Sequence, residues 1–147
     1  MKTKLIAAFA ALLALTPAAL AAPATLTVRI APVVILSAGQ ENVTVPVTLT
    51  LTNSSDQPST LRASNGCEIN TWNVTDSKNT IVTDHEICMM IYQPQTNTLA
   101  PGASQLEVKS LSLRAADYRE GESYTLHYRF WGIFADAPFV VKGQAAN

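Results

Sequence analysis

Apolar and polar residues alternate with a period of two through most of the chain, and this pattern limits the fold more than any other feature. The clearest example spans residues 43–52, where threonines and one proline alternate with four apolar residues: Val45, Val47, Leu49 and Leu51. Successive side chains of a β-strand point to opposite faces, so this segment is typical of a strand with one buried face. No helix of ordinary length is expected in the folded part of the chain.

Similar segments recur along the chain, separated by turn residues about every ten positions. The clearest of them lie at 25–30, 67–76 and 124–130, and the segment 87–92, which is apolar on both faces, predicts a buried strand. Together they predict an all-β chain, folded as an antiparallel immunoglobulin-like β-sandwich of about seven or eight strands. Residues 120–124 loosely resemble a tyrosine corner at the start of a late strand.

Two prolines mark places where strand pairing should be interrupted, because proline has no N–H to donate to a neighbouring strand. After Pro32, the segment 33–36 is expected to lie at an edge or to switch to the other sheet. Pro46 implies that its strand starts there or lies at an edge.

Two other segments change their apolar phase. Within 67–76 the apolar face changes between Ile69 and Trp72, which requires two buried faces or a bulge that re-aims the side chains. Within 106–113 the phase slips at Ser110.

Residues 1–21 predict a secretory signal peptide. Lys2 and Lys4 precede the apolar run 5–15, and small residues follow before the expected cleavage site. The run is too short for a membrane span, which needs about 20 residues. We therefore expect a bacterial protein exported to the periplasm or the extracellular space, with 22–147 as one domain and no membrane insertion after cleavage.

The charge of the mature chain argues against nucleic acid as a partner. Acidic residues outnumber basic ones by 11 to 10 in the full chain, and cleavage would remove two of the lysines. Phosphate binding needs a clustered basic surface.

Cys67 and Cys88 are the two cysteines of the chain. In an exported protein they predict one disulfide, which would stabilise the fold by roughly 3 kcal/mol through the loop that it closes. A free reactive thiol is the alternative.

A cluster of soft ligands raises the possibility of a copper(I) site. His85, Cys88, Met89 and Met90 lie close in sequence, and His127 could add a second imidazole. However, Met89 and Met90 point to opposite faces of a strand, and a disulfide would remove Cys88 as a ligand. Methionine in a buried strand ordinarily fills the core, so we expect no metal and no other cofactor.

The inventory of catalytic residues is poor. Asp84 and Glu86 could form a carboxylate pair, but their neighbours favour a solvated turn. No G-x-S-x-G motif is present. We therefore expect no enzymatic activity.

The segment 129–134 is rich in aromatic residues. By strand parity Phe130 belongs to the core. Trp131 and Phe134 either form an exposed patch that binds a partner or pack against the neighbouring strand.

Four motifs follow one another between Thr44 and Trp131. They are a strand that ends at Asn53 before a polar turn and Pro58, the turn and strand at 64–76, the Leu-x-Pro-Gly turn at 98–104, and the turn and strand at 120–126. In this order and spacing they resemble the BsuPI-type domain of an intracellular proteinase inhibitor family.

The resemblance implies an inhibitor of a serine protease of subtilisin type or, more broadly, a protein-binding module. Such an inhibitor must present a rigid convex loop that loses little entropy on docking. The favoured contact loop consists of Pro94, Gln95, Thr96, Asn97, Thr98 and Leu99, and the second candidate consists of Asp76, Ser77, Lys78 and Asn79. The alternatives are a structural or adhesive domain of the cell envelope and a periplasmic metal binder.

Overall fold

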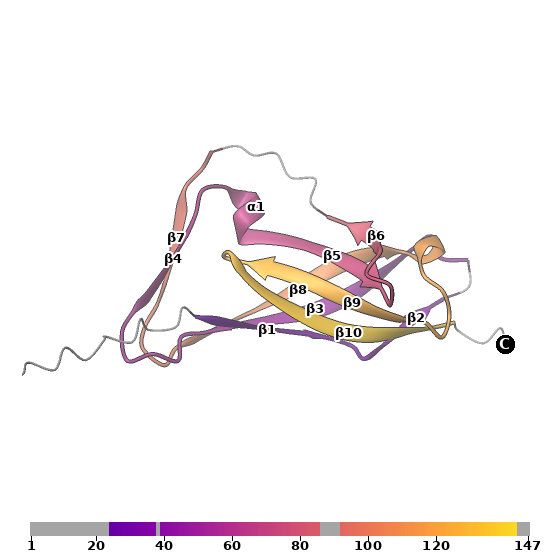
Figure 1. Cartoon of the computed structure of the whole chain (residues 1–147), viewed down its shortest axis with the longest axis horizontal. Helices are drawn as coiled ribbons and strands as arrows, with labels where there is room; N and C mark the ends of the chain where they lie inside the picture. Colours follow the sequence, from indigo (N-terminus) through magenta and orange to yellow (C-terminus); the bar gives the residue numbers. More distant parts are fainter. Residues whose placement is uncertain (1–23, 38, 86–91, 144–147) are drawn as a thin grey trace, which may run out of the picture.

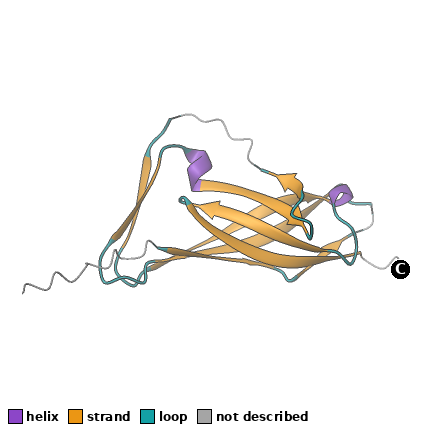
Figure 2. Ribbon diagram, in the orientation of Figure 1, coloured by secondary structure: helices purple, strands orange, loops and turns teal. Residues whose placement is uncertain are grey.

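The computed structural model describes residues 24–37, 39–85 and 92–143, and these residues form mainly β-strands (Figures 1 and 2). The predicted signal peptide, 1–21, lies outside the described residues. In chain order the elements are β1 (Thr25–Ile30), β2 (Val33–Leu36), β3 (Asn42–Thr52), β4 (Ser59–Ala63), α1 (Gly66–Ile69), β5 (Asn70–Asp76), β6 (Ile81–Asp84), β7 (Gln95–Leu99), β8 (Ser104–Arg114), the 3-10 turn η1 (Ala115–Asp117), β9 (Ser123–Phe130) and β10 (Ile133–Gly143).

The strands form two facing sheets and a separate ribbon. One sheet has the order β1-β3-β8, the other has the order β2-β10-β9-β5-β6, and β4 pairs with β7 in a two-stranded ribbon. All pairings are antiparallel except that of β2 with β10. In Figure 1 the ribbon lies at the left and leads up to α1. The all-β sandwich predicted from the alternation is confirmed.

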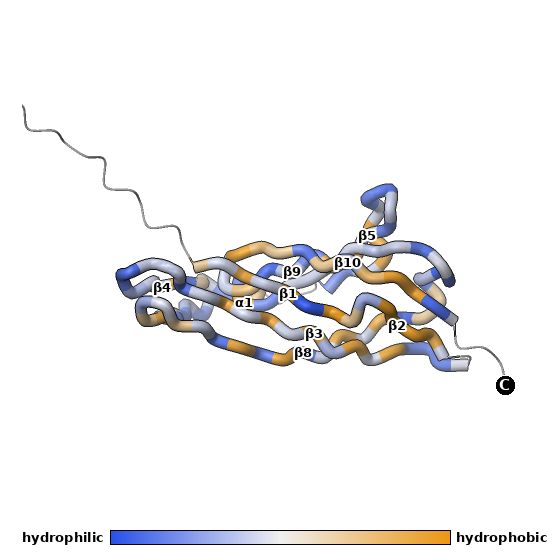
Figure 3. The backbone as a smooth tube through the Cα atoms, turned by 90° about the horizontal axis from the view of Figure 1, so that it is seen from below, coloured by the Kyte–Doolittle hydropathy of each residue, from blue (hydrophilic) through white to orange (hydrophobic). Residues whose placement is uncertain are grey.

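The core lies between the two sheets and is built by the inward residues of the alternating strands. Its fully buried large side chains include Leu49, Leu51, Leu113, Leu126, Tyr128, Phe130 and Phe139. Each such side chain contributes roughly 1.5–3 kcal/mol through burial. Figure 3 shows the alternation as orange and pale or blue stretches that succeed one another along the strands.

A tyrosine at the start of β9 makes the hydrogen bond that defines a tyrosine corner. The backbone N–H of Arg119 donates to the hydroxyl oxygen of Tyr124 over 2.8 Å. Tyr124 also stacks on Phe139 of β10, with ring centroids 5.7 Å apart. These contacts support the immunoglobulin-type assignment, which itself stays a prediction.

Pro32 interrupts pairing as expected, whereas β3 neither starts at Pro46 nor lies at an edge of its sheet. β1 pairs with β3, whereas β2 pairs with β10 of the other sheet, so the chain switches sheets at Pro32. Pro46 lies inside β3, the middle strand of its sheet. However, β1 pairs with β3 only as far as Val47, so one side of Pro46 is locally an edge.

The two phase changes have different physical causes. The expected extended start of 67–76 is wrong, because Gly66–Ile69 forms a short helical turn before β5 begins. The side chain of Asn65 caps this turn by accepting a hydrogen bond from Glu68 N–H. β5 also contains a bulge between Val74 and Thr75.

β8 shows the second phase change without any slip in pairing. Its register with β3 is continuous from Ser104 to Arg114. Leu106 and Val108 are therefore exposed on the outer face. Gln105, Glu107 and Lys109 lie on the inner face and form a polar row joined by a hydrogen bond and an ion pair. Inward charges near a free strand edge discourage pairing with another chain.

Inside the sandwich, this polar row faces a buried tyrosine. The hydroxyl of Tyr128 donates a hydrogen bond to the side-chain oxygen of Asn70. Burial, with a smaller contribution from the Glu107 carboxylate, raises the pKa of Tyr128 to about 12.

The turn between β5 and β6 is braced by one carboxylate. Asp76 Oδ1 accepts hydrogen bonds from Lys78 N–H at 2.8 Å and from Thr80 N–H at 2.9 Å. Asn79 adopts the left-handed conformation, with φ of 60°. The pKa of Asp76 lies below its usual value, chiefly because its carboxylate accepts the hydrogen bond from Thr80 N–H. In Figure 3 this hydrophilic turn projects from the body of the sandwich.

Asn53 joins the end of β3 to two other turns. Its side chain is fully buried, and Nδ2 donates to the carbonyl oxygens of Gln57, Leu99 and Ala100 at 2.8–3.1 Å. Its Oδ1 accepts from the N–H and the hydroxyl of Ser55. A single side chain thus satisfies the polar groups of the 54–57 turn and of the β7–β8 corner.

We expect Asn53→Asp to lower the free energy of unfolding by about 3 kcal/mol, because a carboxylate oxygen would face three carbonyl oxygens that now receive a hydrogen bond. Urea denaturation measures the change. Asn42→Asp, at an exposed position at the start of β3, is the matched control and should leave the midpoint almost unchanged. Equal midpoints for the two variants would contradict this role of Asn53.

We expect Asp76→Ala to speed amide hydrogen exchange at Lys78 and Thr80, because both lose their acceptor. The lowered pKa means that stabilisation by Asp76 is complete above the unfolded-state pKa of about 3.9 and is lost as the pH falls through the folded-state value. Asp76→Asn keeps an acceptor oxygen, so amide exchange at Lys78 and Thr80 should stay slow at pH 7. The loss of protection that accompanies protonation of Asp76 at low pH should disappear in this variant. If Asp76→Asn still lost protection at Lys78 and Thr80 at low pH, Asp76 would not be the group whose protonation causes that loss.

Candidate functional site

The two candidate contact loops from the sequence have different structures. The residues Asp76, Ser77, Lys78 and Asn79 form the tight turn described above, with Lys78 exposed near its tip. A role of this turn in contacting a protease stays a prediction.

The favoured loop at 94–99 is not a loop. Gln95–Leu99 is strand β7, which pairs with β4 from Ser59↔Leu99 to Ala63↔Gln95. Leu99 is buried, and the side chain of Asn97 donates to Gln105 Oε1 over 2.6 Å. The polar composition suggested a loop because the strand has one solvated face and threonines tolerate either setting.

Several of the other candidate residues lie outside the described residues. Cys67 is half-buried in α1, but Glu86, Cys88, Met89 and Met90 fall in the segment 86–91. The disulfide and the methionine part of the copper site therefore stay predictions.

The two histidines do not share a site. The imidazole of His85 packs edge-on against Trp72, an inward residue, with centroids 5.2 Å apart. The imidazole of His127 lies on the outer face of the five-stranded sheet. Among the described residues, no group of three histidine, cysteine or carboxylate side chains is placed to hold a metal ion.

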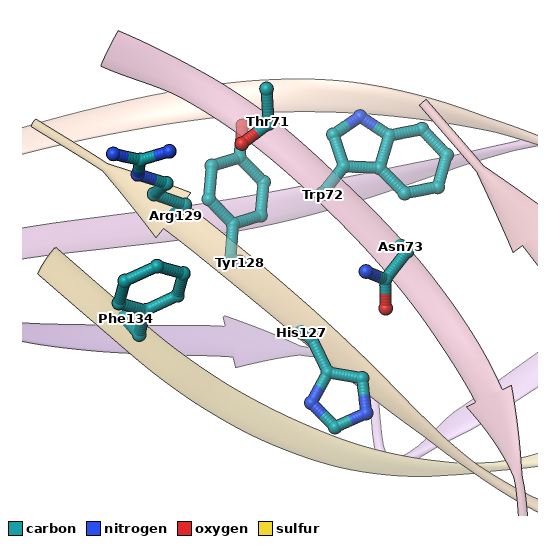
Figure 4. Close-up of a pocket in the computed structure, with 7 residues that line it drawn as sticks. All are labelled: Thr71, Trp72, Asn73, His127, Tyr128, Arg129 and Phe134. Carbon is teal, nitrogen blue, oxygen red and sulfur yellow. The ribbon is translucent and has the colours of Figure 1, made fainter. Parts of the chain in front are cut away.

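A surface pocket lies on this outer face, where β5, β9 and β10 run side by side (Figure 4). The register brings residues from three strands into two neighbouring rows. The first row contains Thr71, Arg129 and Phe134, and the second contains Asn73, His127 and Asp136. All of these residues except Asp136 line a pocket with a volume of about 240 Å³.

His127 is held rigidly in the second row. Its Nδ1 lies 2.7 Å from Asp136 Oδ1, and its Nε2 lies 2.9 Å from the hydroxyl of Thr75. Because a carboxylate can only accept, Nδ1 carries the proton that it donates to Asp136. With both ring nitrogens engaged, His127 orients the surface and is not free to act as a general base.

Arg129 is the cation of the site. Its guanidinium carbon lies 5.4 Å from the centroid of the Phe134 ring, within the range of a cation–π contact. Within the described part of the chain no carboxylate pairs with it. Its Nε is buried and makes no hydrogen bond to a described residue.

A tight hairpin turn between β9 and β10 determines the position of Phe134. Trp131 and Gly132 both have positive φ, at 52° and 77°, which is the geometry of a two-residue type I′ turn. The N–H groups of both residues donate to carbonyl oxygens of α1, Ile69 O and Glu68 O, at 3.1 and 2.9 Å. α1 therefore anchors the hairpin, and Phe134 follows two residues later with 70% of its surface exposed.

Only part of this site could be predicted from the sequence. It singled out the aromatic segment 129–134, of which Phe134 is exposed, whereas Trp131 is partly buried and packs against the core. Asn73 and Arg129 were missed as site residues. They are 56 positions apart in sequence, and only the β5–β9 register brings them together.

The sequence matches no known protein family and no curated protein. In structure it is similar to a β-glucosidase from Listeria innocua (11% identity, TM-score 0.39). It is also similar to a putative β-galactosidase from Bacteroides fragilis (13%, TM-score 0.43) and to the structural genomics target SoR45 (16%, TM-score 0.40).

The match to the β-glucosidase covers 84% of this chain and 17% of the enzyme, and the match to the putative β-galactosidase covers 77% of this chain and 15% of that protein. The match to SoR45 covers 84% of this chain and 90% of SoR45. With TM-scores below 0.5, they carry no argument about function. No helix in the described part of the chain has the length and hydropathy to cross a bilayer.

Proposed function

We propose that this protein is a non-catalytic binding domain, and that the pocket on the outer face of the five-stranded sheet binds a ligand that carries a carboxylate. The observation that supports this most directly is the Arg129 guanidinium, which pairs with no described carboxylate and is held against the exposed ring of Phe134. A planar guanidinium offers two parallel N–H donors that match the geometry of a carboxylate.

The surroundings of Arg129 favour binding over catalysis. Both nitrogens of the nearby imidazole of His127 are already engaged. The other polar side chains of the pocket, Thr71 and Asn73, lack a described base that would activate them. Such groups are suited to hydrogen bonding with a ligand.

Titration with benzoate, followed by amide chemical shifts, tests this proposal. Saturable shifts are expected at Asn73, His127 and Phe134, because benzoate combines a carboxylate with a flat ring. Arg129→Met, which keeps much of the side-chain stem, should weaken binding by at least about tenfold through the loss of a charged hydrogen bond.

Arg29→Met is the matched control for charge, since Arg29 is exposed on the other sheet. It should leave benzoate binding unchanged. Shifts spread evenly over the surface, or an equal loss in the two variants, would count against a defined carboxylate site.

A second candidate function is inhibition of a serine protease of subtilisin type through the 76–79 turn. Two features support it: the turn projects from the sandwich (Figure 3), and the Asp76 carboxylate braces it from inside. A turn that is already rigid loses little entropy when a partner binds it. Lys78, exposed near the tip, is the contact residue that we assign.

Titration of the protein into a subtilisin assay tests this second candidate. Inhibition is expected to rise with protein concentration, and Lys78→Ala should weaken it about tenfold or more if this side chain is the central contact. Lys142→Ala, at an exposed position on β10, serves as the control. Full protease activity at micromolar excess of the wild-type protein would refute the candidate.

A further inference from the structure

We infer that the ligand of the outer-face pocket is an acidic saccharide of the uronic acid type, in which a sugar ring carries the carboxylate. This inference rests on the binding function proposed above and specifies its ligand. It follows from three properties of the pocket: an exposed aromatic ring, hydrogen-bonding side chains without a described partner, and a central strand, β9, whose main chain is already paired on both sides.

The aromatic ring supplies a stacking surface. Phe134 is 70% exposed, the highest value among the large apolar side chains on this sheet face. Its ring also touches the Arg129 guanidinium, so an apolar face and a positive charge lie side by side. A sugar ring with a carboxylate has the complementary pair, an apolar C–H face and a negative charge at its rim.

Two further side chains are available for the hydroxyl groups of such a ring. The side chains of Thr71 and Asn73 are half-buried in the pocket wall, and within the described residues neither makes a side-chain hydrogen bond. A hydroxyl and an amide can both donate and accept, as a sugar hydroxyl does. Polar groups left open in a partly buried wall gain most when a ligand satisfies them.

The size of the pocket suits one small unit. Its volume of about 240 Å³ lies below the range of roughly 300–1,000 Å³ that is typical of sites for drug-sized ligands. The two rows of side chains lie two residues apart along each strand, a separation of about 7 Å. Thr71 and Arg129 therefore flank one side of a ligand, and Asn73 flanks the other.

An acidic peptide fits this surface less well than a sugar. Extended peptides gain most of their affinity from main-chain hydrogen bonds to an open strand edge. β9, which carries Arg129 and His127, pairs along the pocket with β10 on one side and with β5 on the other. Recognition beside Arg129 therefore depends on side chains, which favours a compact ring with several hydroxyl groups.

Asp136 is the carboxylate of the second row, and an acidic ligand must tolerate it. Its Oδ1 accepts a hydrogen bond from His127 Nδ1. The side chain of Asp136 is 63% exposed, so solvent screens its charge.

A matched pair of sugars tests the inference by the same shift measurement. Methyl β-glucuronide and methyl β-glucoside differ only at the carboxylate, and acetate supplies the carboxylate without the ring. The glucuronide is expected to bind at least about tenfold more tightly than either of the other two. Arg129→Met should remove its advantage over the glucoside, and Phe134→Ala should remove its advantage over acetate.

Controls and outcomes separate this inference from the function on which it rests. Leu106→Ala, at an exposed apolar position on the other sheet, should leave all affinities unchanged, and thermal unfolding verifies that every variant is folded. If acetate or a blocked glutamate dipeptide binds as tightly as the glucuronide through Arg129, the carboxylate pocket stands and the saccharide assignment falls. If no probe binds, both fall.

Discussion

The buried amide of Asn53 is the contact on which much of the architecture depends. β3 is the middle strand of its sheet, and its end must be tied both to the next turn and to the corner where β7 leads into β8. An amide can do this because it donates and accepts at the same site, whereas an apolar residue of similar size would leave several buried carbonyl groups unsatisfied. This small network ties the corner before β8 to the end of β3, and the continuous register with β3 positions β8 itself.

The two sheets use their outer faces differently. The three-stranded sheet exposes threonines and two apolar residues of β8, while its inner face carries a polar row near the free edge. The five-stranded sheet instead carries the pocket, because its three central strands bring together a cation, an imidazole and an aromatic ring. The hairpin at Trp131 and Gly132, anchored on α1, determines how Phe134 is presented.

Much of the fold could be predicted from local pattern. The period-two alternation of β3 and β9, the sheet switch at Pro32 and the turn at 76–79 were all expected, because each depends on neighbours in sequence. The segment 94–99 was predicted as a loop and is strand β7, because its pairing with β4 is a contact between distant residues. Leu106 and Val108 fit either face of a strand, and only the register with β3 shows that they point outward.

The sequence by itself therefore determined the all-β class of fold, the limits of the most regular strands, such as β1, β3 and β9, and the inward residues of those strands. These properties follow from the alternation of side chains along one strand. The tertiary structure alone decided the candidate site, since Asn73, Arg129 and Phe134 come from three strands whose relative register no local pattern specifies. A one-residue shift in that register would turn the same side chains to the opposite face.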